Sequence, residues 1–310
     1  MIREIRYKDH EEWLALRRQL GIGGSEAGAV MDLDPYKSPY TLWAEKTGRI
    51  PEFAGNLTTR VGSYLEELVA RLWCEETGKK VRRRNAILVN DDYPCAFADV
   101  DRMVVGENAL LECKTTSSLP VMRSVRGGEF PDRWYCQMMH YLMVTGCDRA
   151  YLAVLVNSRE FYSFVLDRDE EEIRILADAE KAFWDQVQTD TPPEPDGSPS
   201  TAESLETIYA GGGTETAQLF GRESLLSEYF SLKDDRDALD RRMAEICATL
   251  KSDMGNAEKG LCGSYSVSWA PQQRRTFDAG RFAAAHPEVD LTPFYKITTA
   301  RVFRVKNNMQ

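Results

Sequence analysis

The first 190 residues alternate between two hydrophobic periods, and each period identifies a kind of element. Apolar residues three or four positions apart predict helices near residues 10–19, 25–32, 38–47, 57–77, 131–145 and 168–189. Short apolar runs predict strands near residues 81–89, 95–105, 108–115, 149–157 and 160–166. This order of elements predicts an α/β core whose mixed central sheet is flanked by helices.

A proline-rich segment ends this pattern. The run TPPEPDGSPS at residues 191–200 has no hydrophobic period and predicts a linker or boundary loop. We therefore expect a core at residues 1–190, a linker at 191–214 and a C-terminal appendage at 215–310.

The appendage is predicted to be a small α+β structure with one long helix. Its apolar seam alternates spacings of four and three, with Arg236 in the one polar position: Leu225, Tyr229, Leu232, Leu239, Met243, Ile246 and Leu250. Strands are expected near 260–269 and 297–305, and a helix near 277–286. We favour packing of the long helix on these two strands. The alternative is that the seam, or the basic strand with Arg301, Arg304 and Lys306, engages DNA, another subunit or a partner protein.

Candidate chemistry lies where two predicted strands end. Asp101 closes one apolar run, and Glu112 and Lys114 close the next. Because side chains alternate along a strand, Glu112 and Lys114 face one side of the sheet and Cys113 faces the other. Two carboxylates beside an ammonium group suit a hard cation and metal-assisted hydrolysis of a phosphodiester. Taken alone, these three residues are more often the solvated charges of exposed strand ends, and it is the neighbouring elements that favour the metal site.

Two predicted helices bring further polar groups to this place. Glu66 lies at the margin of a helix face formed by apolar positions 61, 65, 68 and 72, from which a carboxylate can reach a metal site. In the helix at 131–145, ended by Gly146, Gln137 lies near the buried stripe and needs a polar partner. The alternatives are that Glu66 is an ordinary carboxylate on the helix surface and that Gln137 forms a structural hydrogen bond within the core.

A glycine-rich segment near the N-terminus offers an anion site. Gly23 and Gly24, followed by Ser25, begin a predicted helix whose first backbone N–H groups are free to bind an anion. Arg18 lies nearby and can hold a phosphate through two parallel hydrogen bonds. Taken without the other elements, such a segment is simply a turn.

Four elements, in this order, resemble one family. They are Arg-x-x-Leu-Gly-Ile-Gly-Gly-Ser ending at Ser25, Gly-x-x-x-Glu ending at Glu66, Asp101 with Glu112-x-Lys114, and the helix that carries Gln137. They are similar to the YqaJ-type viral recombinases, the lambda-exonuclease-like branch of the PD-(D/E)xK nucleases, over roughly residues 12–190. The resemblance implies a restriction-endonuclease-like core.

The resemblance also assigns roles to individual residues. Asp101, Glu112 and the backbone carbonyl of Cys113 would bind Mg²⁺, for which Mn²⁺ would substitute, and Glu66 would complete the site. Lys114 would activate or orient the attacking water, and Gln137 would help to hold the site. Arg18, Gly24 and Ser25 would bind the 5′-phosphate of a DNA end. Asp99 departs from the usual pattern; strand alternation places it on the face of Asp101, and whether it adds a carboxylate stays open.

The activity implied is that of a Mg²⁺-dependent 5′→3′ exonuclease on double-stranded DNA ends, which prepares 3′ single strands for recombination. The resemblance implies a ring-shaped oligomer, a trimer, and a single-strand annealing protein of the RecT or Beta type as partner, in a bacterial cytoplasm and of phage or prophage origin. One alternative is a restriction- or repair-type endonuclease, which has no use for a phosphate pocket. The other is a non-catalytic DNA-end scaffold, against which the intact set Glu66, Asp101, Glu112 and Lys114 argues.

Composition narrows this picture. The net charge of −10 argues against a general DNA binder, so DNA contact must be local. A basic segment before the central strands is expected to contact the DNA backbone, the alternative being a solvated strand edge: Lys79, Lys80, Arg82, Arg83 and Arg84. Seven scattered cysteines without a Cys-x-x-Cys pair indicate reduced thiols and no iron–sulfur cluster. Apolar runs are strand-sized, so no membrane segment is expected.

Overall fold

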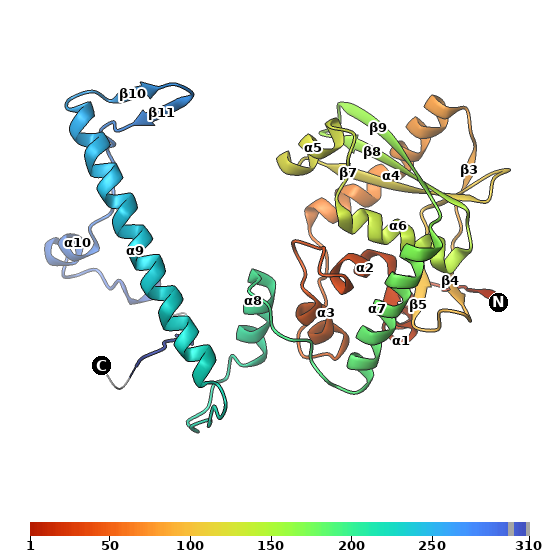
Figure 1. Cartoon of the computed structure of the whole chain (residues 1–310), viewed down its shortest axis with the longest axis horizontal. Helices are drawn as coiled ribbons and strands as arrows, with labels where there is room; N and C mark the ends of the chain where they lie inside the picture. The colour runs from red at the N-terminus through yellow and green to blue at the C-terminus, as the bar shows by residue number, and fades with distance from the viewer. Residues whose placement is uncertain (297–300, 308–310) are drawn as a thin grey trace. The chain divides into compact units, whose positions relative to one another are not determined.

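A computed structural model describes residues 1–296 and 301–307 of the chain. It divides into two compact units, Met1–Ala210 and Gly211–Gln310, which are described separately (Figure 1).

Two sheets form the framework of the first unit (Figure 1). The first sheet has the order β1 (Ile2–Ile5), β4 (Ile87–Asn90), β5 (Ala96–Ala98), β2 (Ile22–Gly23), and only β2 and β5 are parallel. The second has the order β3 (Val81–Arg82), β6 (Arg102–Val104), β7 (Ala109–Thr116), β8 (Arg149–Val156), β9 (Glu160–Asp167), and only β7 and β8 are parallel. The prediction of a mixed α/β fold with helices around mixed sheets is confirmed.

The two strands expected at 81–89 and 95–105 are each divided between the sheets. The second run is interrupted at Asp99–Asp101, which lie between β5 and β6 and outside both strands. There the aspartate side chains accept hydrogen bonds from distant parts of the chain. Asp99 accepts from Trp13 Nε1 at 2.7 Å, and Asp101 accepts from the Cys113 N–H at 2.8 Å. Because neither residue lies in a strand, alternation does not relate Asp99 to Asp101, and that expectation was wrong.

All six predicted helices of the core are present. They are α1 (His10–Leu20), α2 (Gly24–Val30), α3 (Pro39–Lys46), α4 (Leu57–Thr77), α6 (Asp132–Thr145) and α7 (Glu170–Gln188). Gly146 ends α6 in the left-handed conformation at φ 66°, as predicted. Only the C-terminal half of α4 is buried, through Val69, Ala70 and Trp73, so Val61 and Leu68 remain exposed instead of forming a core face.

Two further helices were not predicted: α5 (Leu119–Arg126) and α8 (Pro199–Ile208). The second lies within the segment expected to be a linker. Ser198 caps its start, and Thr201 and Ser204 form buried hydrogen bonds with Ser38 and Thr41 at the start of α3. Pro199 does not exclude a helix here, because proline is well accommodated in the first turn. The first unit therefore extends past residue 190 to Ala210.

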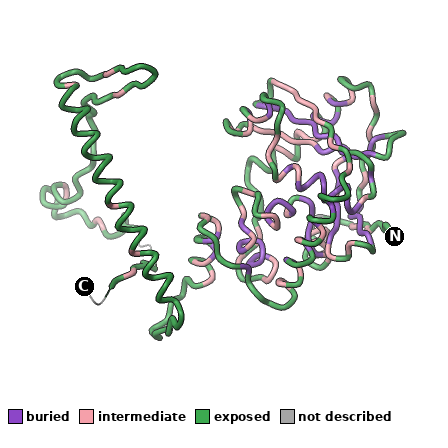
Figure 2. The backbone as a smooth tube through the Cα atoms, in the orientation of Figure 1, coloured by how far each residue is buried: buried purple, intermediate pink, exposed green. Residues whose placement is uncertain are grey.

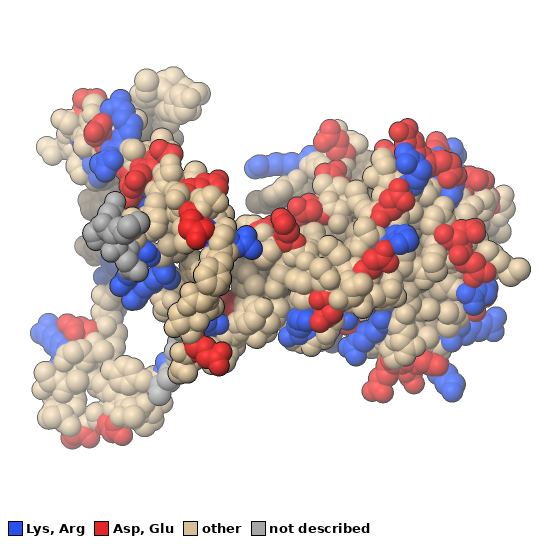
Figure 3. Space-filling model, turned by 60° about the horizontal axis from the view of Figure 1, so that its bottom comes forward, with Lys and Arg blue, Asp and Glu red and all other residues tan. Residues whose placement is uncertain are grey.

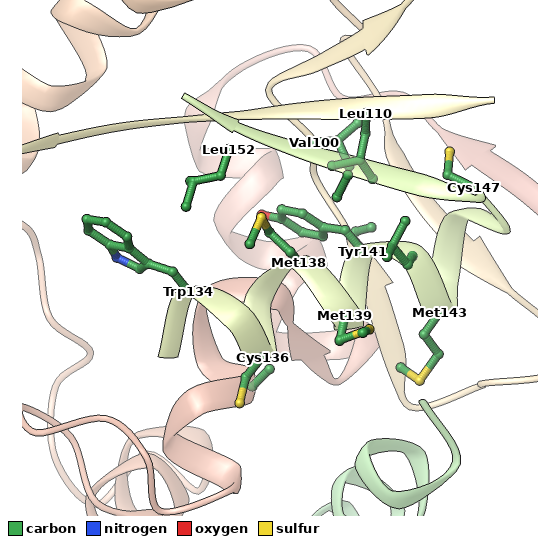
Figure 4. Packing of buried hydrophobic residues seen from close by; sticks show 14 of the residues in the cluster. Val100, Leu110, Trp134, Cys136, Met138, Met139, Tyr141, Met143, Cys147 and Leu152 are labelled. Atoms are coloured by element: carbon green, nitrogen blue, oxygen red, sulfur yellow. The ribbon is translucent and has the colours of Figure 1, made fainter. Parts of the chain in front are cut away.

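Helix α6 is the centre of the hydrophobic core. It is buried over most of its length, and α2, α7 and β5 pack around it (Figure 2). Met138 and Tyr141 point from it toward Leu110 and Leu152 of β7 and β8 (Figure 4). Such a helix fixes the position of any polar side chain that it carries toward the sheet.

The core also contains a buried ion pair that the sequence analysis did not foresee. His140 of α6 is fully buried; its Nδ1 lies 2.6 Å from Oε1 of Glu180 on α7, and its Nε2 lies 2.8 Å from the Phe97 carbonyl oxygen. Burial by itself lowers the pKa of His140, but the charge and hydrogen bond of Glu180 together with the Phe97 carbonyl outweigh it, so the pKa is raised. The doubly protonated ring satisfies both acceptors.

The second unit contains the long helix, α9 (Glu223–Met254), a hairpin of β10 (Lys259–Cys262) and β11 (Tyr265–Ser268), and the short helix α10 (Ala279–Ala285). The single strand expected at 260–269 is thus a hairpin, because Gly263 turns the chain at φ 57°. Of the strand expected at 297–305, residues 297–300 lie outside the described part, and 301–305 form no strand. The expected packing of α9 on two strands is also wrong: α9 has no buried residue (Figure 2).

No helix in the described ranges is both long and apolar enough to span a lipid bilayer.

Candidate active site

Strand β7 and helix α6 build the centre of the candidate site. Glu112 and Lys114 project from β7 on one side, while Cys113 packs on the other side in the cluster beneath α4, which confirms the predicted alternation. Lys114 Nζ lies 2.7 Å from Glu112 Oε1 and donates to Gln137 Oε1 at 2.8 Å. Gln137 Nε2 donates to Glu112 Oε1 at 2.8 Å and to the Tyr141 hydroxyl at 3.0 Å. The three side chains form a closed triangle that holds the ammonium group in one place.

Asp101 lies beside this triangle. Its carboxylate accepts the Cys113 N–H, which ties the loop before β6 to the middle of β7. Burial raises the pKa of Asp101 well above its ordinary value, and the charges of Glu112 and Glu66 raise it further, against opposition from Lys114 and the Cys113 N–H. The negative charge of Asp101 is unfavourable in the protein alone, and a bound cation would stabilise it.

Glu66 belongs to the same charged group, but its nearest partner was not foreseen. Arg102, almost fully buried, donates to Glu66 through Nη1 and to Glu67 Oε2 through Nη2 at 3.0 Å. Glu67, the next residue of α4, thus shares this arginine. A signal was available: Arg102 directly follows Asp101 at the start of a buried strand, where an arginine requires acidic partners.

The donor set fits a divalent cation of the Mg²⁺ type. Glu112 is buried, and its Oε2 atom has no hydrogen-bond partner among the described residues, so one lone-pair-rich oxygen is left for a ligand. No group of three or more His, Cys, Asp or Glu side chains in the described ranges is arranged around one metal position. Two carboxylates with a backbone carbonyl are sufficient for Mg²⁺, which keeps several of its waters.

The predicted phosphate site is arranged differently from the expectation. Arg18 is exposed and pairs with Glu52 at 2.8 Å, whereas Arg17 Nη2 lies 3.4 Å from the hydroxyl of Ser25, an exposed residue. The Arg17 guanidinium stacks over the rings of Trp13 and Phe97, 4.6 and 5.6 Å from their centroids. Arg17, which also pairs with Glu26 at 3.7 Å, is therefore the arginine held beside Ser25.

The start of α2 is already capped. Glu26 accepts the Gly23 N–H at 2.8 Å and pairs with Lys46 at 2.8 Å. Gly24 is buried against Tyr141, and a Cβ atom on Gly24 would lie 2.3 Å from the ring. Gly24 thus serves close packing between α2 and α6, and the side chains of Arg17 and Ser25 offer the polar surface.

The basic segment is largely neutralised by its neighbours. Lys79 pairs with Glu107 at 2.5 Å, Arg83 with Glu67 at 3.1 Å and Arg84 with Glu4 at 2.5 Å. Lys80 and Arg82 are exposed, and a hollow of about 520 Å³ is lined by Arg82 to Arg84 together with Glu4 and Arg6. Acidic and basic side chains are interspersed over the face seen in Figure 3.

Comparison with solved structures defines the class of protein. The alkaline exonuclease LHK-Exo from Laribacter hongkongensis superposes with a TM-score of 0.50 and 18% sequence identity, covering 59% of this chain and 94% of that chain. The same exonuclease in complex with dAMP gives a TM-score of 0.51 at 18% identity, over 66% of this chain and 100% of that chain. The chain therefore contains an α/β domain that shares its fold with this alkaline exonuclease.

Sequence comparison then identifies the family. The YqaJ-like viral recombinase domain matches residues 12–148. The protein YqaJ of Bacillus subtilis (strain 168) is 35% identical over 285 residues, which are 90% of this chain and 89% of that protein. The chain belongs to the YqaJ-like viral recombinase family, as the sequence motifs predicted.

Proposed function

We propose that the protein is a Mg²⁺-dependent 5′→3′ exonuclease of the PD-(D/E)xK type that acts on double-stranded DNA ends and leaves 3′ single-stranded tails for recombination. One observation carries the proposal: the triangle of Glu112, Lys114 and Gln137 beside Asp101. The alkaline-exonuclease fold, and the capture of dAMP by LHK-Exo, support a DNA substrate.

In this proposal, different residues of the site bind the metal ion and assist the hydrolysis. Asp101, Glu112 and the Cys113 carbonyl would hold Mg²⁺, or Mn²⁺ in its place. The bound ion would neutralise charge on the phosphodiester and lower the pKa of a water molecule. Lys114, fixed by Glu112 and Gln137, would either accept a proton from the attacking water as a neutral amine or stabilise the developing negative charge as an ammonium group. The positive charge of Arg102 beside Glu66 weakens the electrostatic repulsion that Glu66 exerts on Asp101 and Glu112.

Digestion of a linear duplex tests the proposal. Each strand is labelled in turn, the ends carry a 5′-phosphate or a 5′-hydroxyl, and Mg²⁺ is present or chelated. We expect progressive Mg²⁺-dependent loss of the 5′-phosphorylated strand. Cleavage of a closed circle would favour the restriction- or repair-type endonuclease, and tight binding without any cleavage would favour the scaffold.

From the position of Arg17 beside Ser25 we predict that Arg17 is the arginine that binds the 5′-phosphate of the DNA end. Arg17→Ala removes the guanidinium held beside Ser25 and is expected to reduce the preference for 5′-phosphate over 5′-hydroxyl ends by about 10-fold or more, the value of one charge-assisted contact. Arg18→Ala, one position away on the same helix and paired with Glu52, is the matched control. Digestion rates on the two kinds of end give the ratio; loss of preference in Arg18→Ala alone would reverse the assignment.

The proposal includes partners suited to this activity. A trimeric ring would enclose the duplex, and a single-strand annealing protein of the RecT or Beta type would receive the exposed strand. Lys80 and Arg82 are exposed, and Arg82 lines the hollow, so these two are the members of the basic segment that we propose contact the DNA backbone.

A further inference from the structure

The seam of α9 is an ordered apolar face that the nuclease proposal does not use. Its residues, here called the α9 seam, are Leu225, Tyr229, Leu232, Arg236, Leu239, Met243, Ile246 and Leu250. The seven apolar members are between 40% and 66% exposed. A single helix with a stripe of this kind is stabilised mainly by packing against a partner.

The spacing specifies what that partner is. A strict alternation of four and three residues matches the 3.5-residue period of a helix that supercoils with another helix, and it gives a face too narrow for a sheet. From residue 225 to residue 250 the seam extends roughly 39 Å. In the described part of the second unit, the other helices have seven and three residues. The exposed apolar stripe of α4, which runs from Leu57 to Leu68, covers less than half of that length.

A second copy of α9 matches the seam in length and in chemistry. In an antiparallel pair centred between Asp237 and Ala238, Leu225 meets Leu250, Tyr229 meets Ile246, Leu232 meets Met243, and Arg236 meets Leu239. Every layer of this arrangement occurs twice by two-fold symmetry. The two Arg236 side chains thus fall in different layers, and each stem packs on a leucine.

The charges that flank the seam select this orientation. In the antiparallel pair Lys233 faces Asp240 of the second copy, and Asp235 faces Arg242 of the second copy, so all four charged contacts join opposite signs. In a parallel pair Arg236 would meet Arg236 in one layer, and Asp235 would meet Asp240. Only the antiparallel arrangement avoids contact between like charges.

We propose that α9 is a dimerisation helix and that two copies of the chain associate through an antiparallel coiled coil formed by the α9 seam. This interface is independent of the nuclease site. It joins two complete first units, whatever association those units have among themselves.

Measurement of the mass of the full chain in solution tests the contact. Leu232→Asp combined with Leu239→Asp places charges in the central layers, at positions exposed in the single chain, so the variant removes no packing within one chain. With a chain mass of 35.2 kDa, sedimentation equilibrium is expected to show that the double variant has half the mass of the unaltered protein or less. Equal masses would overturn the proposal.

A charge exchange tests the orientation. Lys233→Glu, which sets like charges opposite each other twice, is expected to weaken self-association about tenfold, and adding Asp240→Lys restores it. Arg241→Glu, with the same change in charge on the outer face of α9, is the matched control and leaves self-association unchanged. Rescue by Glu228→Lys instead of Asp240→Lys would show a parallel pair and overturn the antiparallel arrangement, as would equal weakening by Lys233→Glu and Arg241→Glu.

Discussion

Replacement of Lys114 by alanine is expected to lower the rate of Mg²⁺-dependent DNA hydrolysis by about 10²–10³-fold, the usual effect of removing one preorganised donor from an active site. The ammonium group is held by Glu112 and Gln137 at 2.7 and 2.8 Å, so no neighbouring cation can take its place without rearrangement of both. DNA binding is expected to persist, because the phosphate contacts proposed for Arg17 and Ser25 lie elsewhere. Single-turnover digestion of a labelled duplex, together with a binding assay, measures the two effects separately.

The matched control is Lys181→Ala, which removes an exposed lysine of α7 that pairs only with Asp185 at 2.6 Å. It is expected to digest DNA at the unaltered rate. Gln137→Ala should fall between the two variants, because Lys114 keeps Glu112 but loses its second anchor. A Lys114→Ala protein that digests as fast as the Lys181→Ala protein would remove Lys114 from the site.

The second large effect is expected in stability. His140→Phe leaves Glu180 fully buried without its cationic partner, which costs about 3–5 kcal/mol in the free energy of unfolding. Urea unfolding, followed by far-ultraviolet circular dichroism, gives this difference. The double variant His140→Phe with Glu180→Leu removes both charges and should recover most of the loss; if it is no more stable than His140→Phe, the pair is not the cause.

The same pair makes stability depend on pH in a stated direction. Since the pKa of His140 is raised in the folded protein, the contribution of the pair is complete below a pH of about 6.5, the value in the unfolded chain, and is lost as pH rises through the raised value. The unaltered protein should therefore lose more stability between pH 6 and pH 9 than the double variant does. Equal losses would show that other groups account for the dependence.

The sequence was sufficient for features set by local periodicity. Alternation alone placed Glu112 and Lys114 on one face of β7, and the apolar stripe of α6 placed Gln137 toward them. Left-handed glycine at position 146 was recognisable as the end of a helix because few other residues adopt that conformation. The family resemblance supplied the grouping of these elements into one site, which periodicity does not give.

Features that depend on tertiary contacts were missed. Arg17 and Arg18 differ by about 100° around α1, and only the packing shows which of them lies beside Ser25: Trp13, one turn before Arg17, stacks on Arg17. The division of residues 95–105 between two sheets depends on hydrogen bonds from Trp13 and Cys113, which are distant in sequence. Helix α8 was not predicted because the prolines of this segment indicate a loop. The contacts that hold α8, hydrogen bonds to the hydroxyl groups of Ser38 and Thr41, are formed with residues distant in sequence.

The contact of Gly24 with Tyr141 has a consequence for how two parts of the candidate site are joined. The Tyr141 ring touches the start of α2 on one side, and its hydroxyl accepts a hydrogen bond from Gln137 on the other. The start of α2, proposed to bind the DNA end, and Gln137 of the proposed hydrolytic site are therefore connected through one buried aromatic side chain. A substitution at Gly24 that displaces Tyr141 is therefore expected to disturb both groups at once.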